Sequence, residues 1–518
     1  MMNARTPLIR NGDEKPAMSS ADSDLKLFVA VTLGVFASTL FFYGFIYSLH
    51  QDLAGGALSG SLAVALGDSF REYSIYFPPV EKFWFSLAVR LSDLTGLRLD
   101  LAIVAMTDAM VLVAATIAYQ IRRATVGASP IFFILSVAVL ITLPILFKNV
   151  FGLREHIVAL GLWPYLVLRF SDPEGARIDW RLRLLLGLWV GATLLFKYVY
   201  SAVVILVELA DSLMQRQPAL LFRVENITSG MVVFLYLFVW LGLDPSQRDA
   251  IGAMMNSIDA NLLDTNENSL KLIHNLLPAC LLLFASWYSG VPGRSSGLAV
   301  ATVLATLIAA WSQERWYTHH LLPITMAYIA WWWLAARNFR WYFNVAAALL
   351  ILLPIAGQFV STRIYQAQST ELEEALEDGG ITLSGKRVAI LTMHPSPYNQ
   401  YLASHGAMRW NPMMNNAYVA AELKPFDKPA IAASAPPLKL DNPGRKMLHD
   451  QMLRLWEDFP PDVLILDGTH RWPLRYIDVD WAHVFSEDPR FKAIFSKYRR
   501  EMVYNGKRIK FTYYVRAD

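Results

Sequence analysis

Two carboxylates, Asp68 and Glu72, lie one helical turn apart in a short polar stretch that also contains Tyr73 and ends in a rigid Pro78-Pro79 step. A carboxylate at a cavity near a membrane can take a proton from an attacking hydroxyl, or hold a metal ion or an acceptor. A solvated loop in which Asp68 caps a helix explains the same residues, because Asp and Ser are favoured at helix starts. The residue types alone leave both interpretations open.

A second ionisable group is the triplet Arg154, Glu155 and His156, at the expected start of an apolar helix. Three such residues at the end of a membrane helix are costly unless they face water, one another or a ligand. A salt bridge and a helix cap are the structural alternative. Lys197 interrupts another apolar run, and snorkelling of its side chain to the membrane surface is the simplest explanation.

A third stretch, from Gln313 to Pro323, contains Arg315 and the adjacent histidines His319 and His320. The planar guanidinium of an arginine suits a phosphate, and a nearby histidine can add a hydrogen bond or a proton. Adjacent histidines also suggest a metal, but two ligands without a clear third are a weak indication. A divalent cation therefore stays open, and the sequence requires no cofactor.

The elements that must position these residues belong to a membrane protein. The chain is 55% hydrophobic and 17% charged, against roughly 45–50% and 25% in an average soluble domain. Its formal net charge of +3 provides no basic field for nucleic acid. The single cysteine, Cys280, excludes an intramolecular disulfide.

About eleven apolar stretches approach the roughly twenty residues that cross a bilayer core. They cover residues 27–48, 98–121, 130–147, 155–170, 183–197, 198–214, 226–243, 272–290, 296–311, 318–336 and 340–360. Lys and Arg are more frequent in the loops on the side of the N-terminus, which predicts a cytoplasmic N-terminal tail over 1–26. An odd number of spans then places the chain after residue 361 on the outer side. Residues 50–66 and 80–95 are predicted to be helices along the outer leaflet.

Residues 362–518 have the composition of an ordinary globular domain. Apolar runs at 388–391 and 463–466 predict buried strands, and helices are expected near 371–378, 398–408 and 445–457. Residues 499–516 alternate around Asn505-Gly506, the preferred two-residue hairpin turn. The pattern predicts a small soluble α/β domain, in which His394 and Asp467 follow strands and are interpreted as mainly structural.

The first polar stretch resembles the first outer loop of the GT-C superfamily of membrane glycosyltransferases, which includes protein mannosyltransferases and aminoarabinose transferases. In that family an acid of this loop is catalytic or orients the acceptor. The resemblance places this role at Asp68, with Glu72 as a weaker match. The acid that follows an arginine in the second outer loop of the family matches Glu155 and Arg154 in place and type.

Two further elements carry the same resemblance. Related transferases have a lysine near the position of Lys197, where it faces the donor phosphate. Arg315, followed by an aromatic residue and Leu-Pro, resembles another pattern of the family. The resemblance implies a GT-C-like bundle of about eleven transmembrane helices in a bacterial inner membrane, with a periplasmic C-terminal domain.

The implied activity is transfer of a sugar from a polyprenyl-phosphate donor to an envelope glycan, lipid or protein acceptor, with inversion. Arg315, Lys197 and Arg154, helped by His319 or His320, would neutralise the leaving phosphate. Asp68 would deprotonate or orient the acceptor hydroxyl, and Tyr73 and His156 complete the expected binding residues.

The hypothesis requires Asp68 to meet Arg154, Lys197 and Arg315 at a single mouth. A transporter or flippase of a lipid-linked substrate is an alternative, because it also explains many spans with charged residues. A scaffold without catalytic activity in envelope assembly is a third interpretation.

Overall fold

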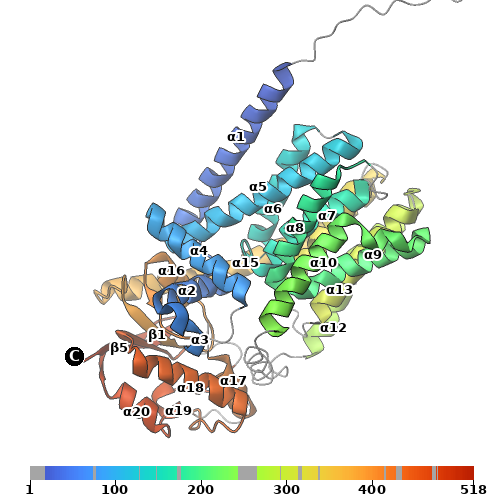
Figure 1. Cartoon of the computed structure of the whole chain (residues 1–518). Coiled ribbons are helices and arrows are strands. Elements are labelled where there is room, and N and C mark those ends of the chain that lie inside the picture. Colours follow the sequence, from blue (N-terminus) through green and yellow to red (C-terminus); the bar gives the residue numbers. More distant parts are fainter. Residues whose placement is uncertain are drawn as a thin grey trace, which may run out of the picture.

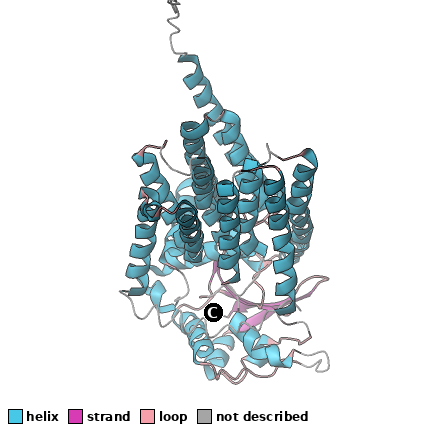
Figure 2. Ribbon diagram, turned by 90° about the vertical axis from the view of Figure 1, so that its right-hand side faces the viewer, coloured by secondary structure: helices cyan, strands magenta, loops and turns pink. Residues whose placement is uncertain are grey.

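The computed structural model shows a bundle of helices and, beside one end of the bundle, a small domain that contains a β-sheet (Figure 1, Figure 2). The structure describes residues 18–73, 78–127, 129–147, 149–171, 177–242, 265–291, 293–312, 318–335, 339–412, 416–427, 434–469, 474 and 476–517.

Five helical stretches in the described part of the chain are long and apolar enough to cross a membrane: Leu25–Ile46, Leu99–Val126, Trp180–Gln215, Val224–Gly242 and Gly293–Trp311. Shorter apolar helices cover Pro130–Leu146, Leu276–Tyr288 and Trp341–Ile351. The chain therefore has the character of a helical membrane protein. Each of the predicted spans overlaps a helix, but the number of crossings stays a prediction.

The helices of the bundle are α1 (Met18–Phe41), η1 (Phe42–Ile46), α2 (Gln51–Leu66), η2 (Gly67–Ser69), α3 (Phe70–Tyr73), α4 (Pro79–Thr95), α5 (Leu99–Val126), α6 (Pro130–Leu146), α7 (Arg154–Ser171), α8 (Trp180–Leu194), η3 (Leu195–Tyr200), α9 (Ser201–Gln215), η4 (Pro218–Phe222), α10 (Val224–Leu237), η5 (Phe238–Gly242), α12 (Thr265–Tyr288), α13 (Gly293–Trp311), η7 (Thr318–Leu321), α14 (Leu322–Ala335) and α15 (Trp341–Asp378).

Lys197 separates α8 from α9 and reverses the chain. Its backbone is not helical, with φ −154° and ψ 76°. Arg183, near the start of α8, contacts Glu225, and Arg169 joins Glu225 to Glu208 near the end of α9. In one straight helix Arg183 and Glu208 would lie about 37 Å apart. The two helices therefore form a hairpin with Lys197 at its tip, where the sequence predicts the boundary between two spans.

The helix α2 is enclosed by other parts of the protein, and its predicted place along the outer leaflet stays a prediction. Its residues from Leu53 to Gly60 are all buried, because α4 packs on one side and the soluble domain on another. A Cβ atom on Gly60 would come within 2.7 Å of the backbone carbon of Phe85, so only glycine permits this approach of α4. On α4, by contrast, Phe83, Leu87 and Leu94 are exposed, as an apolar face turned toward lipid would be.

The soluble domain contains a five-stranded sheet with strand order β2-β1-β3-β5-β4. Its strands are β1 (Arg387–Leu391), β2 (Met408–Arg409), β3 (Val463–Asp467), β4 (Tyr498–Asn505) and β5 (Lys510–Arg516). The first three are parallel, and β5 pairs antiparallel with both β3 and β4. Both predicted buried strands and the predicted pairing of two strands in a hairpin are confirmed. The turn lies two residues later than predicted, because Asn505 pairs with Lys510 and the N–H of Gly506 donates to the carbonyl oxygen of Ile509.

The helices of the soluble domain are α16 (Tyr398–Ser404), α17 (Ala417–Leu423), η8 (Lys424–Phe426), α18 (Pro443–Asp458), α19 (Trp481–Val484) and α20 (Pro489–Phe495). The predicted helix over 398–408 is shorter than expected, because Gly406 has a positive φ of 67° and β2 follows it.

The bundle and the soluble domain are not separated by a linker. The helix α15 runs without a break through the predicted boundary at residue 361 and ends at Asp378. One hydrophobic core includes Val388 and Ile465 of the sheet together with Leu53 of α2 and the interior of the bundle. This continuous packing places the start of α2 between the two parts of the molecule.

Candidate functional site

Glu155 is a buried carboxylate in the first turn of α7. A carboxylate at a helix N-terminus is favoured by the free N–H groups and the helix dipole. Nζ of Lys197 donates a hydrogen bond to its Oε1. The Nε2 atoms of His320 and His319 lie 3.6 and 3.9 Å from the same oxygen. Residues from two separate segments therefore converge on one carboxylate of a third segment.

Lys197 is held inside the protein by an ion pair. Its side chain is only 12% exposed and points to the buried Glu155. The break in the helix at Lys197 makes this contact available, because it places the lysine at the tip of the α8–α9 hairpin. A buried lysine and carboxylate stabilise each other only when both keep good partners, so this pair is a fixed element of the site.

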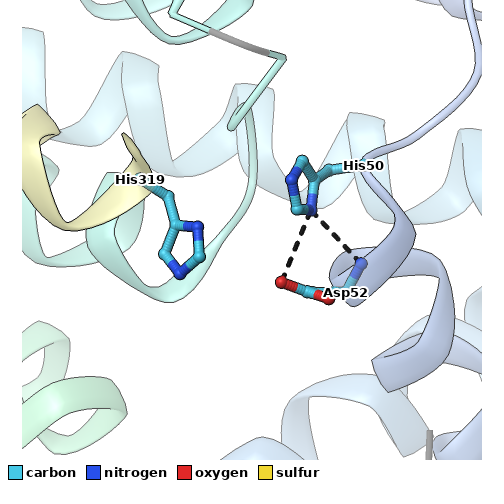
Figure 3. Close-up of side chains that lie close together, drawn as sticks. All are labelled: His50, Asp52 and His319. Carbon is cyan, nitrogen blue, oxygen red and sulfur yellow. Dashed lines mark hydrogen bonds and ion pairs between the residues drawn. The ribbon is translucent and has the colours of Figure 1, made fainter. Parts of the chain in front are cut away.

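His50 and Asp52 stand at the start of α2 and face His319 from another segment of the chain (Figure 3). Nδ1 of His50 accepts the backbone N–H of Asp52 at 3.2 Å and lies 3.7 Å from Oδ2 of Asp52. The ring centroids of His50 and His319 are 6.0 Å apart, and the ring centroids of His319 and His320 are 4.5 Å apart. His319 thus connects the start of α2 to Glu155.

We call these residues the histidine–carboxylate cluster: His50, Asp52, Glu155, Lys197, His319 and His320. The cluster lies at the end of the bundle that meets the soluble domain, because Gln51 contacts both His394 and Asn399. Asp52 is its most accessible carboxylate, with 35% of its side chain exposed against 2% for Glu155.

Arg154 and Glu81 form an ion pair beside the cluster. Nη1 of Arg154 lies 3.3 Å from Oε1 of Glu81, which is buried on α4. Burial raises the pKa of Glu81, while the charge of Arg154 acts in the opposite direction. The arginine side chain is 39% exposed, so the guanidinium can reach a ligand in solvent while it keeps its contact with α4.

The cluster contains two overlapping sets of metal-binding groups. His50, Asp52 and His319 each offer one ligand atom, and so do Glu155, His319 and His320; within each set the atoms lie within 4.8 Å of one another. Imidazole nitrogen and carboxylate oxygen suit Zn²⁺ and other divalent first-row ions. Because His319 belongs to both sets, the cluster offers alternative ligands for one ion.

The structure brings together four of the residues proposed from the sequence: Glu155, Lys197, His319 and His320. Arg154 lies next to them on α7. Arg315 lies outside the described residues, so its predicted contact with phosphate is not described.

Asp68 is an exposed residue of η2, beyond the far end of α2, and its predicted meeting with Arg154, Lys197 and Arg315 stays a prediction. Sixteen helical residues from Gln51 to Leu66 carry the chain about 24 Å away from Asp52. The side chain of Glu72 lies outside the described residues. Tyr73 is buried and donates a hydrogen bond to Asp458 of the soluble domain at 2.7 Å, which is a structural contact.

His156 is also not a ligand-binding residue. Its Nδ1 accepts the N–H of Gly152 at 2.9 Å, and its Nε2 lies 2.9 Å from the carbonyl oxygen of Leu140. Both ring nitrogens are therefore used by the backbone. The ring is fully buried against Phe151, so His156 stabilises the turn before α7.

Sequence reasoning missed His50 and Asp52. They are the first polar pair after the first span, and a histidine and a carboxylate two residues apart can serve one ligand when a turn or helix start brings them together. The family pattern instead matches the acids farther along the same stretch. A search of protein-family models and a search of curated proteins each found no match for this chain.

Proposed function

We propose that this chain is a membrane glycosyltransferase that moves a sugar from a polyprenyl-phosphate donor to a hydroxyl of an envelope glycan, lipid or protein. The observation that carries the proposal is the histidine–carboxylate cluster, which gathers acids, bases and a cation from separate segments at one end of a helical membrane bundle. A bacterial inner membrane, a cytoplasmic N-terminus and a periplasmic soluble domain are parts of the same proposal.

Asp52 is the proposed base. Its carboxylate is partly exposed and held at the start of α2, beside His50. In this role Asp52 takes the proton of the acceptor hydroxyl while the oxygen attacks the anomeric carbon of the sugar. The bond to the donor phosphate breaks on the opposite face, so the anomeric configuration inverts.

The leaving phosphate needs positive charge. Lys197, Arg154 and the neighbouring His319 are the groups that would bind it. Glu155 holds the ammonium group of Lys197 in place. Arg154, the residue before Glu155, has a partly exposed side chain. Placement at the end of the bundle lets the prenyl tail of the donor remain in lipid.

A divalent cation is compatible with this arrangement. Glu155, His319 and His320 would hold it and leave Asp52 for the acceptor. Such an ion supplies positive charge to a phosphate without a proton transfer.

The test is a transfer assay with the full-length protein in nanodiscs, using polyprenyl phosphates that carry hexoses or pentoses. We expect release of polyprenyl phosphate and a rate about 10²- to 10⁴-fold lower in Asp52→Asn. Asp93→Asn removes an exposed carboxylate on α4 and is the matched control. Release from none of the donors, or an unchanged rate in Asp52→Asn, would refute the proposal. Movement of the intact donor across a vesicle membrane would support the transporter instead.

A further inference from the structure

The soluble domain contacts the turn that carries Asp52. Gln51 lies between His50 and Asp52, and its carbonyl oxygen accepts a hydrogen bond from Nδ2 of Asn399 at 3.3 Å. The side chain of Gln51 also lies 3.5 Å from Nε2 of His394. The start of α2 is therefore held from the side of the soluble domain, by two residues about 350 positions away along the chain.

Asn399 is held in turn by Arg409. The guanidinium of Arg409 donates a hydrogen bond to Oδ1 of Asn399. An arginine side chain has only donors, so the amide oxygen of Asn399 must face Arg409 and its NH₂ group must face Gln51. Both side chains are buried, Asn399 completely. The orientation of the Asn399 amide is thus fixed by chemistry.

Arg409 has little else to bind. Its Nε and Nη2 atoms have no hydrogen-bond partner among the described residues, and burial lowers the pKa of its guanidinium to about 9. Burying a charge with so few partners is costly. Its bond to Asn399 is the compensation that the described residues provide.

We propose that Asn399 is a positioning residue of the candidate site. Held by Arg409, it fixes the carbonyl of Gln51 and thereby the places of His50 and Asp52. In this proposal the soluble domain contributes to the geometry of the candidate site. The role given to Asp52 rests on the proposed function, whereas the hydrogen bonds from Arg409 through Asn399 to Gln51 are testable without any activity.

The first experiment measures hydrogen–deuterium exchange of the full-length protein in nanodiscs. Asn399→Ala removes both hydrogen bonds, and Asn399→Asp keeps an acceptor for Arg409 but loses the donor to Gln51. In both variants we expect the amides at the start of α2, such as that of Ala54, to exchange about fivefold faster, the factor that one net hydrogen bond represents.

Two comparisons make this result specific. Ser404→Ala changes a part-buried residue of α16 and should leave exchange at α2 unchanged. Among the described residues, its hydroxyl bonds only to its own helix and to His405. The strands β1 and β3 should keep their protection in Asn399→Asp, because a general loss of the soluble fold would expose them too. Unchanged exchange at α2 in Asn399→Asp would overturn the inference.

The second experiment measures sugar transfer. We expect kcat to fall about 10- to 100-fold in Asn399→Asp, the usual effect of losing a residue that orients a functional group, with the KM for the donor unchanged. If the wild type transfers no sugar while exchange responds as expected, the proposed function fails and the positioning role stands. If the wild type transfers sugar and Asn399→Asp changes neither kcat nor exchange, the inference fails and the function stands.

Discussion

Two groups of buried charges lie near the two ends of α7 and are built from different residues. The histidine–carboxylate cluster surrounds Glu155 at the start of the helix. The second group surrounds Arg169, fourteen positions farther along, or about 21 Å away. We call this second group the arginine clamp. Its members are Arg169, Glu208, Asp211, Arg223, Glu225 and Arg294.

Every carboxylate of the arginine clamp binds at least one guanidinium. Arg169 donates to Glu208 and reaches Glu225 at 2.8 Å. Arg223 lies 3.2 Å from Asp211, which Arg294 also binds at 3.0 Å. The arginine clamp joins α7, α9, α10 and α13 at one level, and its carboxylates are almost completely buried.

The two groups differ in the nitrogen-containing side chains that face their carboxylates: guanidinium groups in the arginine clamp, and imidazoles with one lysine in the histidine–carboxylate cluster. A guanidinium keeps its proton at any physiological pH and binds carboxylates with a fixed planar geometry, so the arginine clamp is suited to hold helices. An imidazole exchanges protons near neutral pH and binds metals. The histidine–carboxylate cluster also includes a partly exposed carboxylate, Asp52. Charge inside the bundle alone does not identify a site. The histidines and the partly exposed Asp52 are what favour the histidine–carboxylate cluster as the candidate site.

The largest expected effect comes from breaking the arginine clamp. Arg169→Met would leave Glu208 and Glu225 buried without their shared cation, which costs about 3–5 kcal/mol. We expect a strongly lowered Tm and yield of the detergent-purified protein. Arg181→Met, an exposed arginine of α8, is the control and should unfold like the wild type.

A compensated variant sharpens the same prediction. In Arg169→Met combined with Glu208→Gln and Glu225→Gln, no unpaired charge remains among these three positions, so much of the stability should return. An Arg169→Met protein with the Tm of the wild type would show that this group is not a clamp.

The next effect separates function from stability. Glu155→Gln keeps the size of the side chain but removes the charge that faces Lys197, His319 and His320. We expect sugar transfer to fall about 10- to 100-fold, as when an orienting partner of a functional group is lost. The Tm should fall less than in Arg169→Met, because a lysine that loses its partner can give up its proton. The rate of sugar transfer and the Tm are measured on the same purified protein. A large loss of Tm with normal turnover per folded molecule would mean that both groups are clamps.

The sequence predicted the parts of this architecture that depend on local patterns. The apolar runs predicted the strands at 388–391 and 463–466, and the alternation over 499–516 predicted the hairpin, because both signals lie within a few residues. The Asn505-Gly506 signal placed the turn two residues too early, because Asn505 pairs with Lys510. The break at Lys197 was also predictable, since a charge interrupts an apolar run there. The sequence also predicted that Glu155, Lys197 and the two histidines lie close together, because it places all four at the outer ends of predicted spans.

The features that the sequence did not predict depend on contacts between distant segments. Residues 50–66 are small and apolar without a strong amphipathic pattern, so their periodicity could not show that the soluble domain covers them. Without that information, Asp52 and Asp68 are two acids of the same loop after the first span, and the sequence does not show which one lies at the cluster. Similarly, nothing near His156 shows that the carbonyl of Leu140 takes up its second ring nitrogen.

The smallest expected effect concerns Asp68. Its side chain is exposed beyond the far end of α2, and exposed substitutions of this kind usually change stability by less than about 0.5 kcal/mol. Asp68→Asn should therefore keep both the Tm and the rate of sugar transfer, under conditions in which Asp52→Asn loses the transfer. The two variants remove the same charge from the two ends of one helix, so the assay compares position alone. If Asp68→Asn abolished transfer and Asp52→Asn did not, the site would lie at the C-terminal end of α2. The histidine–carboxylate cluster would then be a structural element, like the arginine clamp.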